Sequence, residues 1–303
     1  MRTKKILFVC TGNVFRSMSA EYLLRKYLED NKISGWEVAY AGIIAKKEKI
    51  DPETIKSLKK LGIEKINHTQ KKLTKDLLKK YDVIIPMAED HKKFINSKFG
   101  LKTLLFNELV NNKNTSIGDI EDDIKDWKIN RNAVEKKLRA TVNEISKSIP
   151  LLFKNTSERY FLFEEFVSGG KKHKNGFPFI KLYETKRTVS FMSLDIPGKE
   201  DGHILVIPKK RYAELSDIPK STQHELIESV AKIGKSLTKN HGGYNVLLNN
   251  NAEADQYIFH THFHIIPRNY NDNITIEKWK NKTISVTEFK NLNKKIKKII
   301  NNT

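Results

Sequence analysis

The fold of the first half is decided by the stretch Val9-Cys10-Thr11-Gly12-Asn13-Val14-Phe15-Arg16-Ser17. An apolar run at residues 6–9 predicts a short buried strand, and apolar residues between Ala20 and Leu28 recur at the spacing of one helical face. The single cysteine therefore lies at the end of a predicted strand, just before the loop that leads to a helix. Unpaired backbone N–H groups and the helix dipole make such a place favourable for phosphate, and they lower the pKa of a thiol.

Cys10 and Arg16 bracket five residues that can wrap around an anion. Arg16 can hold two phosphate oxygens as a fork, Cys10 as a thiolate can attack phosphorus, and Ser17 can hydrogen-bond that thiolate. The pattern alone is loose, and a buried cysteine beside a solvated arginine is the alternative. The strand–loop–helix context favours the phosphate-binding interpretation.

The composition places the chain among globular proteins of about two domains. It has 303 residues, 38% of them hydrophobic, and no apolar run long enough for a membrane-spanning helix or a signal peptide. One cysteine excludes an intrachain disulfide, so we expect a cytoplasmic protein. The net charge of +20 comes mostly from lysines spread along the chain, which predicts weak nonspecific attraction to polyanions rather than a focused nucleic-acid groove.

Strand and helix signals alternate through the first half. Strands are expected at residues 6–9, 36–41, 82–87 and 104–106, with helices between them and a last helix from Val134 to Ile149. This alternation predicts an α/β fold with a doubly wound, parallel, four-stranded sheet. Ligands of such sheets bind at the carboxyl ends of the strands, where Cys10 lies.

The second half has a different pattern. Strand signals at residues 177–183, 189–194, 204–207, 244–249 and 257–266 surround one long helix that carries Leu226 and Val230. Strands segregated from a helix predict an α+β domain with an antiparallel sheet. A polar stretch at residues 154–157 predicts a linker, so the expected units are 1–153, 158–270 and a helical tail at 271–303.

An acidic segment, Ile120-Glu121-Asp122-Asp123-Ile124-Lys125-Asp126-Trp127, stands out in this basic chain. It precedes the last helix of the first half, so the dipole of that helix does not account for it. It is either a solvated turn or the source of a general acid that protonates a leaving oxygen.

Three histidines, His260, His262 and His264, alternate along a predicted strand and would share one face. Stacked structural histidines would each need a buried partner, which makes that explanation weak. A zinc site is one remaining possibility and a histidine nucleophile is the other. His203 beside another strand and the polar turn at residues 249–256 suit a ribose and a phosphate better than a bare metal, so catalysis is favoured.

The first half resembles the low-molecular-weight protein tyrosine phosphatases over residues 3–153. The resemblance rests on the Cys10–Ser17 loop and on Tyr40-Ala41-Gly42, His68, Leu73-Thr74 and Met87. It implies that Cys10 is the nucleophile and that Arg16 binds phosphate. Gly12, Asn13 and Ser17 are then substrate-binding residues of the phosphate loop, with Asn13 holding its shape and Ser17 assisting the thiolate. The acid comes from a late Asp-Pro in that family. Here Asp122 aligns best, and because Asp123 replaces the proline, Asp119 and Asp126 are rivals.

The second half resembles the histidine-triad (HIT) nucleotide hydrolases over residues 158–270. The match of His260–Arg268 with Gln256 before it carries the resemblance. It implies that His262 attacks an α-phosphate to form a nucleotidyl-histidine, with His260, His264 and His203 around it. Asp195 matches a ribose contact and Asn249 a phosphate and ribose contact. Glycines are common in the family where this chain has Asn251 and Asp255. Such domains commonly pair as dimers.

Together these patterns predict a bifunctional phosphohydrolase without metal or cofactor. We expect the first site to cleave a phosphorylated protein or small phosphomonoester. We expect the second to cleave a purine nucleoside phosphate or dinucleoside polyphosphate. Two alternatives remain, namely a phosphate or nucleotide sensor with one or both sites inactive, and nucleic-acid end processing by deadenylation. The tail helix, with Phe289, Leu292, Ile296 and Ile299 on one face and lysines on the other, fits a packed or dimer-stabilising helix better than a membrane-surface helix.

Overall fold

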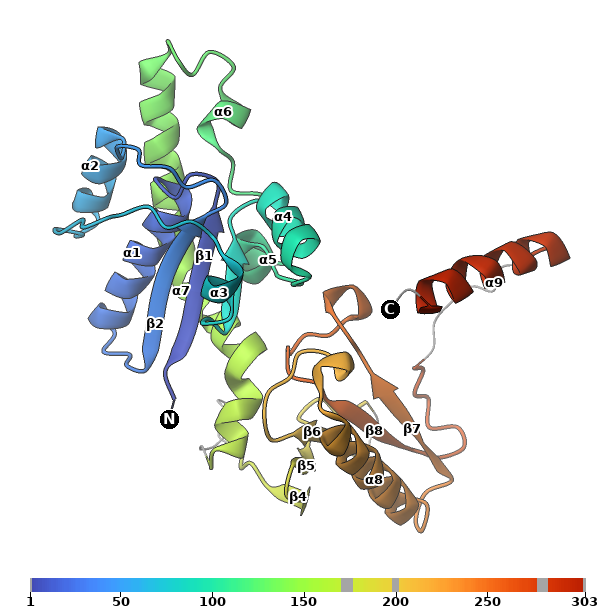
Figure 1. Cartoon of the computed structure of the whole chain (residues 1–303). Helices are drawn as coiled ribbons and strands as arrows, with labels where there is room; N and C mark the ends of the chain where they lie inside the picture. Colours follow the sequence, from blue (N-terminus) through green and yellow to red (C-terminus); the bar gives the residue numbers. More distant parts are fainter. Residues whose placement is uncertain (1, 170–176, 198–201, 277–282, 302–303) are drawn as a thin grey trace.

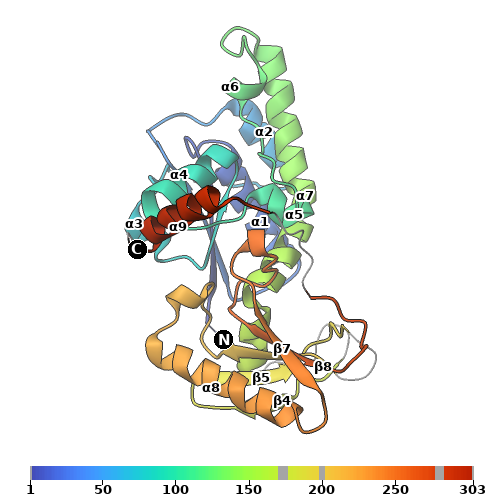
Figure 2. The ribbon, with the colours of Figure 1, turned by 90° about the vertical axis from the view of Figure 1, so that its right-hand side faces the viewer.

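The computed structural model describes residues 2–169, 177–197, 202–276 and 283–301. Its strands form two sheets, one of three parallel strands in the order β2-β1-β3 and one of five strands in the order β4-β5-β6-β8-β7. The two sheets belong to two bodies that follow one another along the chain, and one long helix runs from the first into the second (Figures 1 and 2).

The first sheet is buried on both faces. Its strands are β1 (Lys4–Cys10), β2 (Trp36–Gly42) and β3 (Val83–Pro86), and Cys10 pairs in register with Gly42. Ile6 and Phe8 of β1 belong to one core cluster, and Leu7 and Val9 belong to another on the opposite face. This alternation of side chains across a strand confirms the doubly wound class.

Most of the helices that cover this sheet lie in segments where the sequence predicts a helix, whereas the short helices at residues 106–111 and 120–123 were not predicted. Thr74, for example, caps α3 by accepting a hydrogen bond from the backbone N–H of Leu77 at 3.1 Å. The helices are α1 (Arg16–Asp30), α2 (Pro52–Lys60), α3 (Lys75–Leu78), α4 (Glu89–Phe99), α5 (Phe106–Asn111), α6 (Ile120–Asp123) and α7 (Arg131–Val167).

The expected fourth strand at residues 104–106 is wrong. Within the described residues the parallel sheet has three strands, and Phe106 is the first residue of α5. The carboxylate of Glu108 accepts a hydrogen bond from the backbone N–H of Leu105 at 2.6 Å. This bond satisfies an N–H at the helix start, so the short apolar run enters a helix instead of pairing with a sheet.

The expected linker at residues 154–157 is also wrong, because α7 continues through it. Thr156 is fully buried, and the side-chain amide of Asn155 donates to the carbonyl of Leu109 at 2.7 Å. Thr156 and Asn155 therefore pack against the rest of the molecule, while Lys154 stays exposed. Farther along α7, Phe161 belongs to the core of the first body, whereas Phe163 belongs to the core of the second.

The second sheet confirms the antiparallel α+β prediction. Its strands are β4 (Lys181–Glu184), β5 (Thr188–Met192), β6 (Ile204–Pro208), β7 (Gly243–Leu248) and β8 (Phe263–Arg268), and all its pairs are antiparallel. Helix α8 (Lys220–Leu237) packs on β6 and β8 through the predicted stripe of Leu226 and Val230. Two short 3-10 turns, η1 (Leu215–Asp217) and η2 (Ala252–Ala254), lie in the loops.

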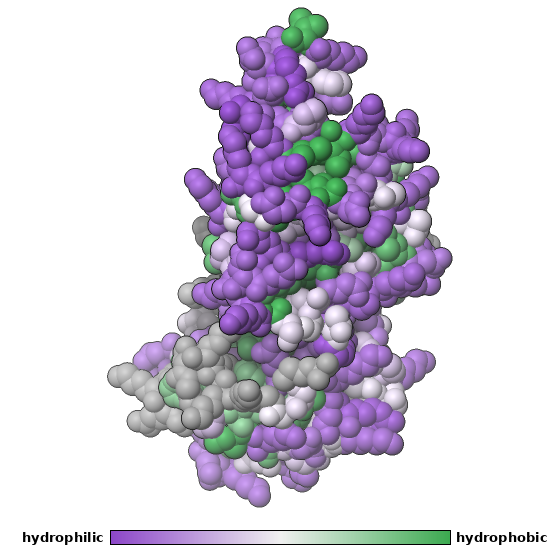
Figure 3. Space-filling view, turned by 90° about the vertical axis from the view of Figure 1, so that its left-hand side faces the viewer, coloured by the Kyte–Doolittle hydropathy of each residue, from purple (hydrophilic) through white to green (hydrophobic). Residues whose placement is uncertain are grey.

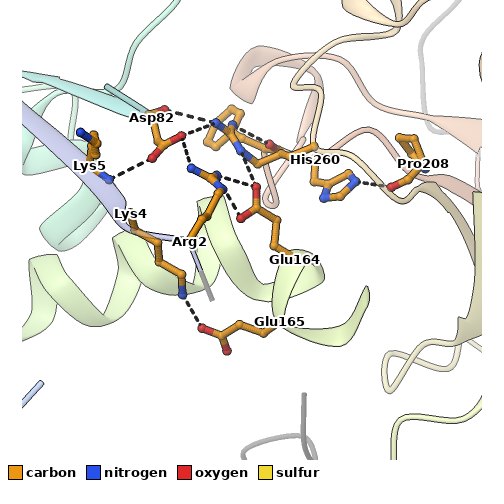
Figure 4. A network of polar contacts seen from close by, with 10 residues as sticks. Arg2, Lys4, Lys5, Asp82, Glu164, Glu165, Pro208 and His260 are labelled. Atoms are coloured by element: carbon orange, nitrogen blue, oxygen red, sulfur yellow. Dashed lines mark hydrogen bonds and ion pairs between the residues drawn. The ribbon is translucent and has the colours of Figure 1, made fainter. Parts of the chain in front are cut away.

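A network of charges joins the two bodies (Figure 4). Arg2 donates to Asp82 of the first body at 2.7 Å and to Glu164 of α7 at 2.8 Å. Arg211, from the loop after β6, donates to the carbonyl of Asp82 at 3.3 Å and lies 3.6 Å from the Glu164 carboxylate. Tyr160 of α7 stacks on Phe259 of the second body, with ring centroids 5.0 Å apart. The bodies are therefore in direct contact.

The outer surface is mainly hydrophilic. On the face seen in Figure 3, apolar side chains gather in separate groups among hydrophilic ones. The last helix, α9 (Val286–Asn301), buries none of its residues. No helix among the described residues is both long enough and apolar enough to span a bilayer.

Candidate active sites

The first candidate site is the loop between β1 and α1. The Sγ of Cys10 lies 2.9 Å from the Oγ of Ser17, and the Ser17 hydroxyl also accepts from the side-chain amide of Asn13 at 2.9 Å. All three side chains are buried. The structure thus brings together the thiol, hydroxyl and amide that the sequence predicted to share one loop.

Asn13 fixes the shape of this loop. Its φ of 60° is left-handed, a conformation that asparagine tolerates better than most residues. Its side-chain oxygen accepts from the backbone N–H of Lys71 at 2.9 Å, and its carbonyl accepts from Nε2 of His68 at 2.5 Å. A Cβ at Gly42 would lie 2.7 Å from the Thr11 carbonyl oxygen, so only glycine lets β2 approach the loop so closely.

Arg16 lies at the start of α1 and is 3% exposed. Its guanidinium donates to the carbonyl of Ile117 and to the hydroxyl of Thr11, both at 3.0 Å, and forms a short ion pair with Asp119. The charged group is thus held at the loop by three partners from different segments. Such a buried, oriented guanidinium is suited to a phosphate dianion.

His91 of α4 is hydrogen-bonded to Thr11 of the loop. Its Nε2 lies 2.9 Å from the Thr11 hydroxyl oxygen, and the residue is fully buried. Burial, followed by the nearby positive charge of Arg16, lowers the pKa of His91 to about 4. The Thr11 hydroxyl therefore accepts from Arg16 and is also hydrogen-bonded to the neutral ring of His91. Sequence reasoning missed His91, although its position just after β3, at the carboxyl end of a parallel strand, was the available signal.

The three candidate acids have different surroundings. Asp119 caps α6 by accepting from the backbone N–H of Ile120 at 2.9 Å, and its other oxygen meets Arg16. Asp122 lies in the single turn of α6 and is exposed. Asp126 is also exposed and accepts from the side-chain amide of Asn130 at 3.2 Å. Only Asp119 among these three makes a described contact with a residue of the Cys10 loop.

The second candidate site is formed by histidines from two neighbouring strands. Strand β8 begins at Phe263, so His260 and His262 precede the strand in which they were predicted to lie. His203, just before β6, lies with its Nε2 2.8 Å from Nδ1 of His264, and the two rings stack. The rings of His262 and His264 are 4.7 Å apart. Three of the four imidazoles therefore form a contiguous row.

The hydrogen bonds fix the tautomer of His262. Its Nδ1 lies 2.7 Å from the carbonyl oxygen of His260, and a carbonyl can only accept, so Nδ1 carries the hydrogen. The lone pair is therefore on Nε2. Burial lowers the pKa of His262, and the neighbouring His203 lowers it further, so the ring is neutral near pH 7.

His260 has a different position from the other two members of the triplet. Its Nε2 donates to the carbonyl of Pro208 at 2.7 Å, and Phe163 of α7 contacts its ring edge-on, as it does the ring of His262. Burial lowers the pKa of His260 to about 3. Phe163 and Arg211, whose guanidinium faces the Phe259 carbonyl at 3.5 Å, were not predicted from sequence, because both owe their position to α7 and the contact between the two bodies.

The predicted nucleotide contacts are distributed around this row. Asp195 is exposed, and its backbone carbonyl accepts from Nδ1 of His203 at 2.7 Å. Asn249 directly follows β7 and is half-buried. Gln256 is buried. Its side-chain oxygen accepts a hydrogen bond from the backbone N–H of Asn251, and its side-chain nitrogen donates one to the carbonyl of Ala213, both at 2.7 Å. Its side chain therefore supports the turn.

That turn explains two departures from the HIT pattern. Asn251 and Asp255 have positive φ angles of 73° and 59°. Glycine is the usual residue for such backbone, and Asn and Asp are the residues that replace it at least cost. The substitutions therefore preserve the turn. Across the described segments, no group of three or more His, Cys, Asp or Glu side chains is arranged to hold a metal ion.

Comparison with known proteins gives two family matches in chain order. A family model described as low molecular weight phosphotyrosine protein phosphatase matches residues 5–161, and a HIT domain model matches residues 177–271. The protein-arginine-phosphatase of Bacillus subtilis is 32% identical over 150 residues, covering 47% of this chain and 97% of that protein.

Two yeast proteins match the second half. Adenosine 5′-monophosphoramidase HNT1 of Candida albicans is 41% identical over 101 residues, which cover 31% of this chain and 65% of that protein. Adenosine 5′-monophosphoramidase hnt1 of Schizosaccharomyces pombe is 35% identical over 123 residues, covering 41% of this chain and 90% of that protein. The chain therefore belongs to the low molecular weight phosphotyrosine protein phosphatase family and carries in its second half a HIT domain, so that both parts belong to hydrolase families.

Proposed function

We propose that this chain is a bifunctional phosphohydrolase whose two sites work independently. The observation that carries the proposal is the separation of two complete nucleophile arrangements. Lys4, at the start of β1, pairs with Glu165 of α7 near the second body. Cys10 is six residues farther along the same strand, about 20 Å away. Because β1 carries Cys10 away from this contact, we infer that the two sites do not share a reacting group.

At the first site, Cys10 attacks phosphorus of a phosphomonoester. The S–P bond forms as the P–O bond to the leaving group breaks, while Arg16 and the loop N–H groups neutralise the charge on the phosphoryl oxygens. The Ser17 hydroxyl, 2.9 Å from Sγ, stabilises the thiolate when water later attacks phosphorus and expels it. The products are the free alcohol or phenol and inorganic phosphate.

The proton donor to the leaving oxygen is, in this proposal, Asp119. Its contact with Arg16 places the carboxyl at the loop, and a phosphate dianion that binds Arg16 would disfavour a second negative charge there. In the second step Asp119 accepts a proton from the attacking water. Asp122, which the alignment with the family motif favours, lies in the same turn and is the competing assignment.

At the second site, Nε2 of His262 attacks the α-phosphate of a nucleotide. The N–P bond forms as the bond to the leaving group breaks, giving a nucleotidyl-histidine that water hydrolyses to a nucleoside monophosphate. His203 donates Nδ1–H to the Asp195 carbonyl, so its Nε2 accepts from His264 Nδ1, and the lone pair of His264 faces outward. Asp195 and Asn249 are proposed to hold the ribose and the phosphate.

The relatives suggest which substrates to test. The B. subtilis protein is named an arginine phosphatase and the yeast proteins adenosine monophosphoramidases. A screen should pair a phosphotyrosine peptide with a phosphoarginine peptide, and an AMP phosphoramidate with a dinucleoside polyphosphate and adenylated DNA. Turnover at both sites supports the proposal. Binding of phosphate or AMP without turnover would instead identify a sensor, and turnover of adenylated DNA above the other nucleotides would identify end processing.

The HIT part is also proposed to form a homodimer. Strand β7 is an edge of the five-stranded sheet, and Tyr244 and Val246 on it are 37% and 41% exposed. An exposed edge with apolar residues is a surface for pairing with a second copy. Sedimentation equilibrium of the whole chain tests this, and a mass of one chain at all concentrations would contradict it.

A further inference from the structure

Helix α9 is a separate surface feature that neither site uses. It comprises 16 residues, buries none of them, and projects away from both sheets (Figure 1). The sequence favoured a packed helix at this place, but the helix has no residue in either core. Most helices are stabilised by burying one apolar face against the rest of the protein. Because α9 does not do this, its apolar face needs a partner outside the two cores.

The apolar face of α9 is continuous. Val286, Phe289, Leu292, Ile296 and Ile300 follow one another at intervals of three and four residues, which places them within one side of the helix. Their side chains are between 48% and 71% exposed. Large apolar residues exposed in this number on one element mark an interaction surface.

The opposite face is positively charged. Lysines occupy positions 290, 294, 295, 297 and 298, and Glu288 is the one acidic residue in the helix sequence. The Glu288 carboxylate accepts from the backbone N–H and the hydroxyl of Ser285, at 2.8 and 2.9 Å, so it is engaged in closing the helix start. Five lysines less one glutamate give the helix a formal charge of +4 in a chain of +20.

We propose that α9 binds the surface of an anionic lipid bilayer, lying in the plane of the headgroups. Large aliphatic and aromatic residues on one side with lysines on the other are the features of an interfacial helix, and such a bilayer offers both an apolar layer and negative charge. A second copy of α9 would bring ten lysines together, which like-charge repulsion opposes. A nucleic acid would attract the lysines but would leave the apolar face uncovered.

Co-sedimentation of the whole chain with vesicles tests this proposal. We expect binding to vesicles of phosphatidylglycerol and phosphatidylcholine that weakens as salt rises, and little binding to phosphatidylcholine alone. Replacing three lysines (Lys294→Gln, Lys297→Gln, Lys298→Gln) should weaken binding about a hundredfold, at roughly fivefold per lysine. The pair Phe289→Ser and Ile296→Ser should abolish it without changing the charge.

A matched control is Ile227→Ser on α8, which removes an apolar residue of similar exposure, 54%, and should leave vesicle binding unchanged. Hydrolysis at both sites should be normal in every variant, because none of these residues touches a site. Equal binding to uncharged vesicles, or unchanged binding of the Phe289/Ile296 variant, would overturn the proposal. So would a fall in oligomer mass in that variant without vesicles, which would identify a second copy as the partner.

Discussion

The guanidinium of Arg16 and the carboxylate of Asp119 form an ion pair beside the Cys10 loop. This pair joins the start of α1 to the acidic segment, and it distinguishes Asp119 from the exposed Asp122. If Asp119 is the proton donor, Asp119→Asn should lower kcat for a phenyl phosphate with a poor leaving group by about 10²–10⁴-fold, the usual worth of general acid catalysis. Steady-state kinetics measure this directly.

Asp122→Asn is the matched control for that experiment. It removes a carboxylate from the same turn, and we expect kcat to change less than threefold. A leaving group that needs no proton, such as p-nitrophenolate, should reduce the effect of Asp119→Asn, because departure then requires little assistance. The reverse ranking of the two variants would assign the acid to Asp122.

Gly42 sets the distance between β2 and the phosphate loop. A Cβ there would lie 2.7 Å from the Thr11 carbonyl oxygen and 2.9 Å from the Asn13 Cβ, so Gly42→Ala must displace the loop. We expect phosphatase kcat/KM to fall at least tenfold while nucleotide hydrolysis is unchanged, since misplacing reacting groups by about 1 Å is costly. Gly243→Ala, where a Cβ meets nothing within 4 Å, is the control and should be silent in both assays.

His91 should make the protein less stable in acid. Its pKa is lowered to about 4 by burial, while a histidine in the unfolded chain keeps a value near 6.5. Between these values the unfolded state binds the additional proton, so the stability that His91 contributes is lost as pH falls from about 6.5 toward 4. Between pH 7.5 and 5.5 this loss is about 1 kcal/mol.

Urea unfolding at the two pH values measures that difference. The variant His91→Asn cannot titrate, so its free energy of unfolding should fall by about 1 kcal/mol less than that of the natural chain. The comparison uses the pH dependence of each protein, so an overall destabilisation of the variant does not affect it. Equal pH dependence in both proteins would show that His91 is not held neutral.

Arg211 should support the nucleotide site from the contact between the two bodies. It faces the carbonyls of Phe259 and Asp82 and the carboxylate of Glu164. Arg211→Gln leaves those groups with fewer partners and loosens the segment before His260, so we expect a loss of about 1–3 kcal/mol in stability. Nucleotide hydrolysis should fall severalfold and phosphatase activity should not.

Arg187→Gln is the control for that variant, because Arg187 pairs with Glu225 of α8, and α8 packs on the opposite face of the second sheet from α7. Both activities should survive this change. Assays at a temperature well below the unfolding midpoint separate a local effect of Arg211 from general unfolding. A parallel loss of both activities in Arg211→Gln would contradict the local role.

The parts of the fold that sequence predicts well are those with local causes. The strand, loop and helix around Cys10 follow from a short apolar run, a polar loop and a helical period, all between Lys4 and Asp30. The antiparallel second sheet likewise follows from strand-sized apolar runs. Around Cys10 and in β5 and β6, most of the apolar residues that define the element are also the ones that it buries.

Two of the errors arise from contacts between residues that are distant in the sequence. The polar residues 154–157 predicted a linker. However, Thr156 is buried and the side-chain amide of Asn155 donates a hydrogen bond to the carbonyl of Leu109 in α5, so tertiary packing keeps α7 helical. The alternation of His260, His262 and His264 predicted one strand, but β8 begins only at Phe263, and the Pro208 carbonyl accepts a hydrogen bond from His260. Propensity is a weak prior where such packing decides.

The central claim is that two independent nucleophiles serve two substrates in one chain. One measurement tests it most directly, the rates of p-nitrophenyl phosphate and AMP phosphoramidate hydrolysis by the same preparations of the natural chain, Cys10→Ser and His262→Ala. The account predicts that Cys10→Ser abolishes only the first rate and His262→Ala only the second. Loss of both rates through either single substitution, in a protein that still unfolds cooperatively, would contradict it.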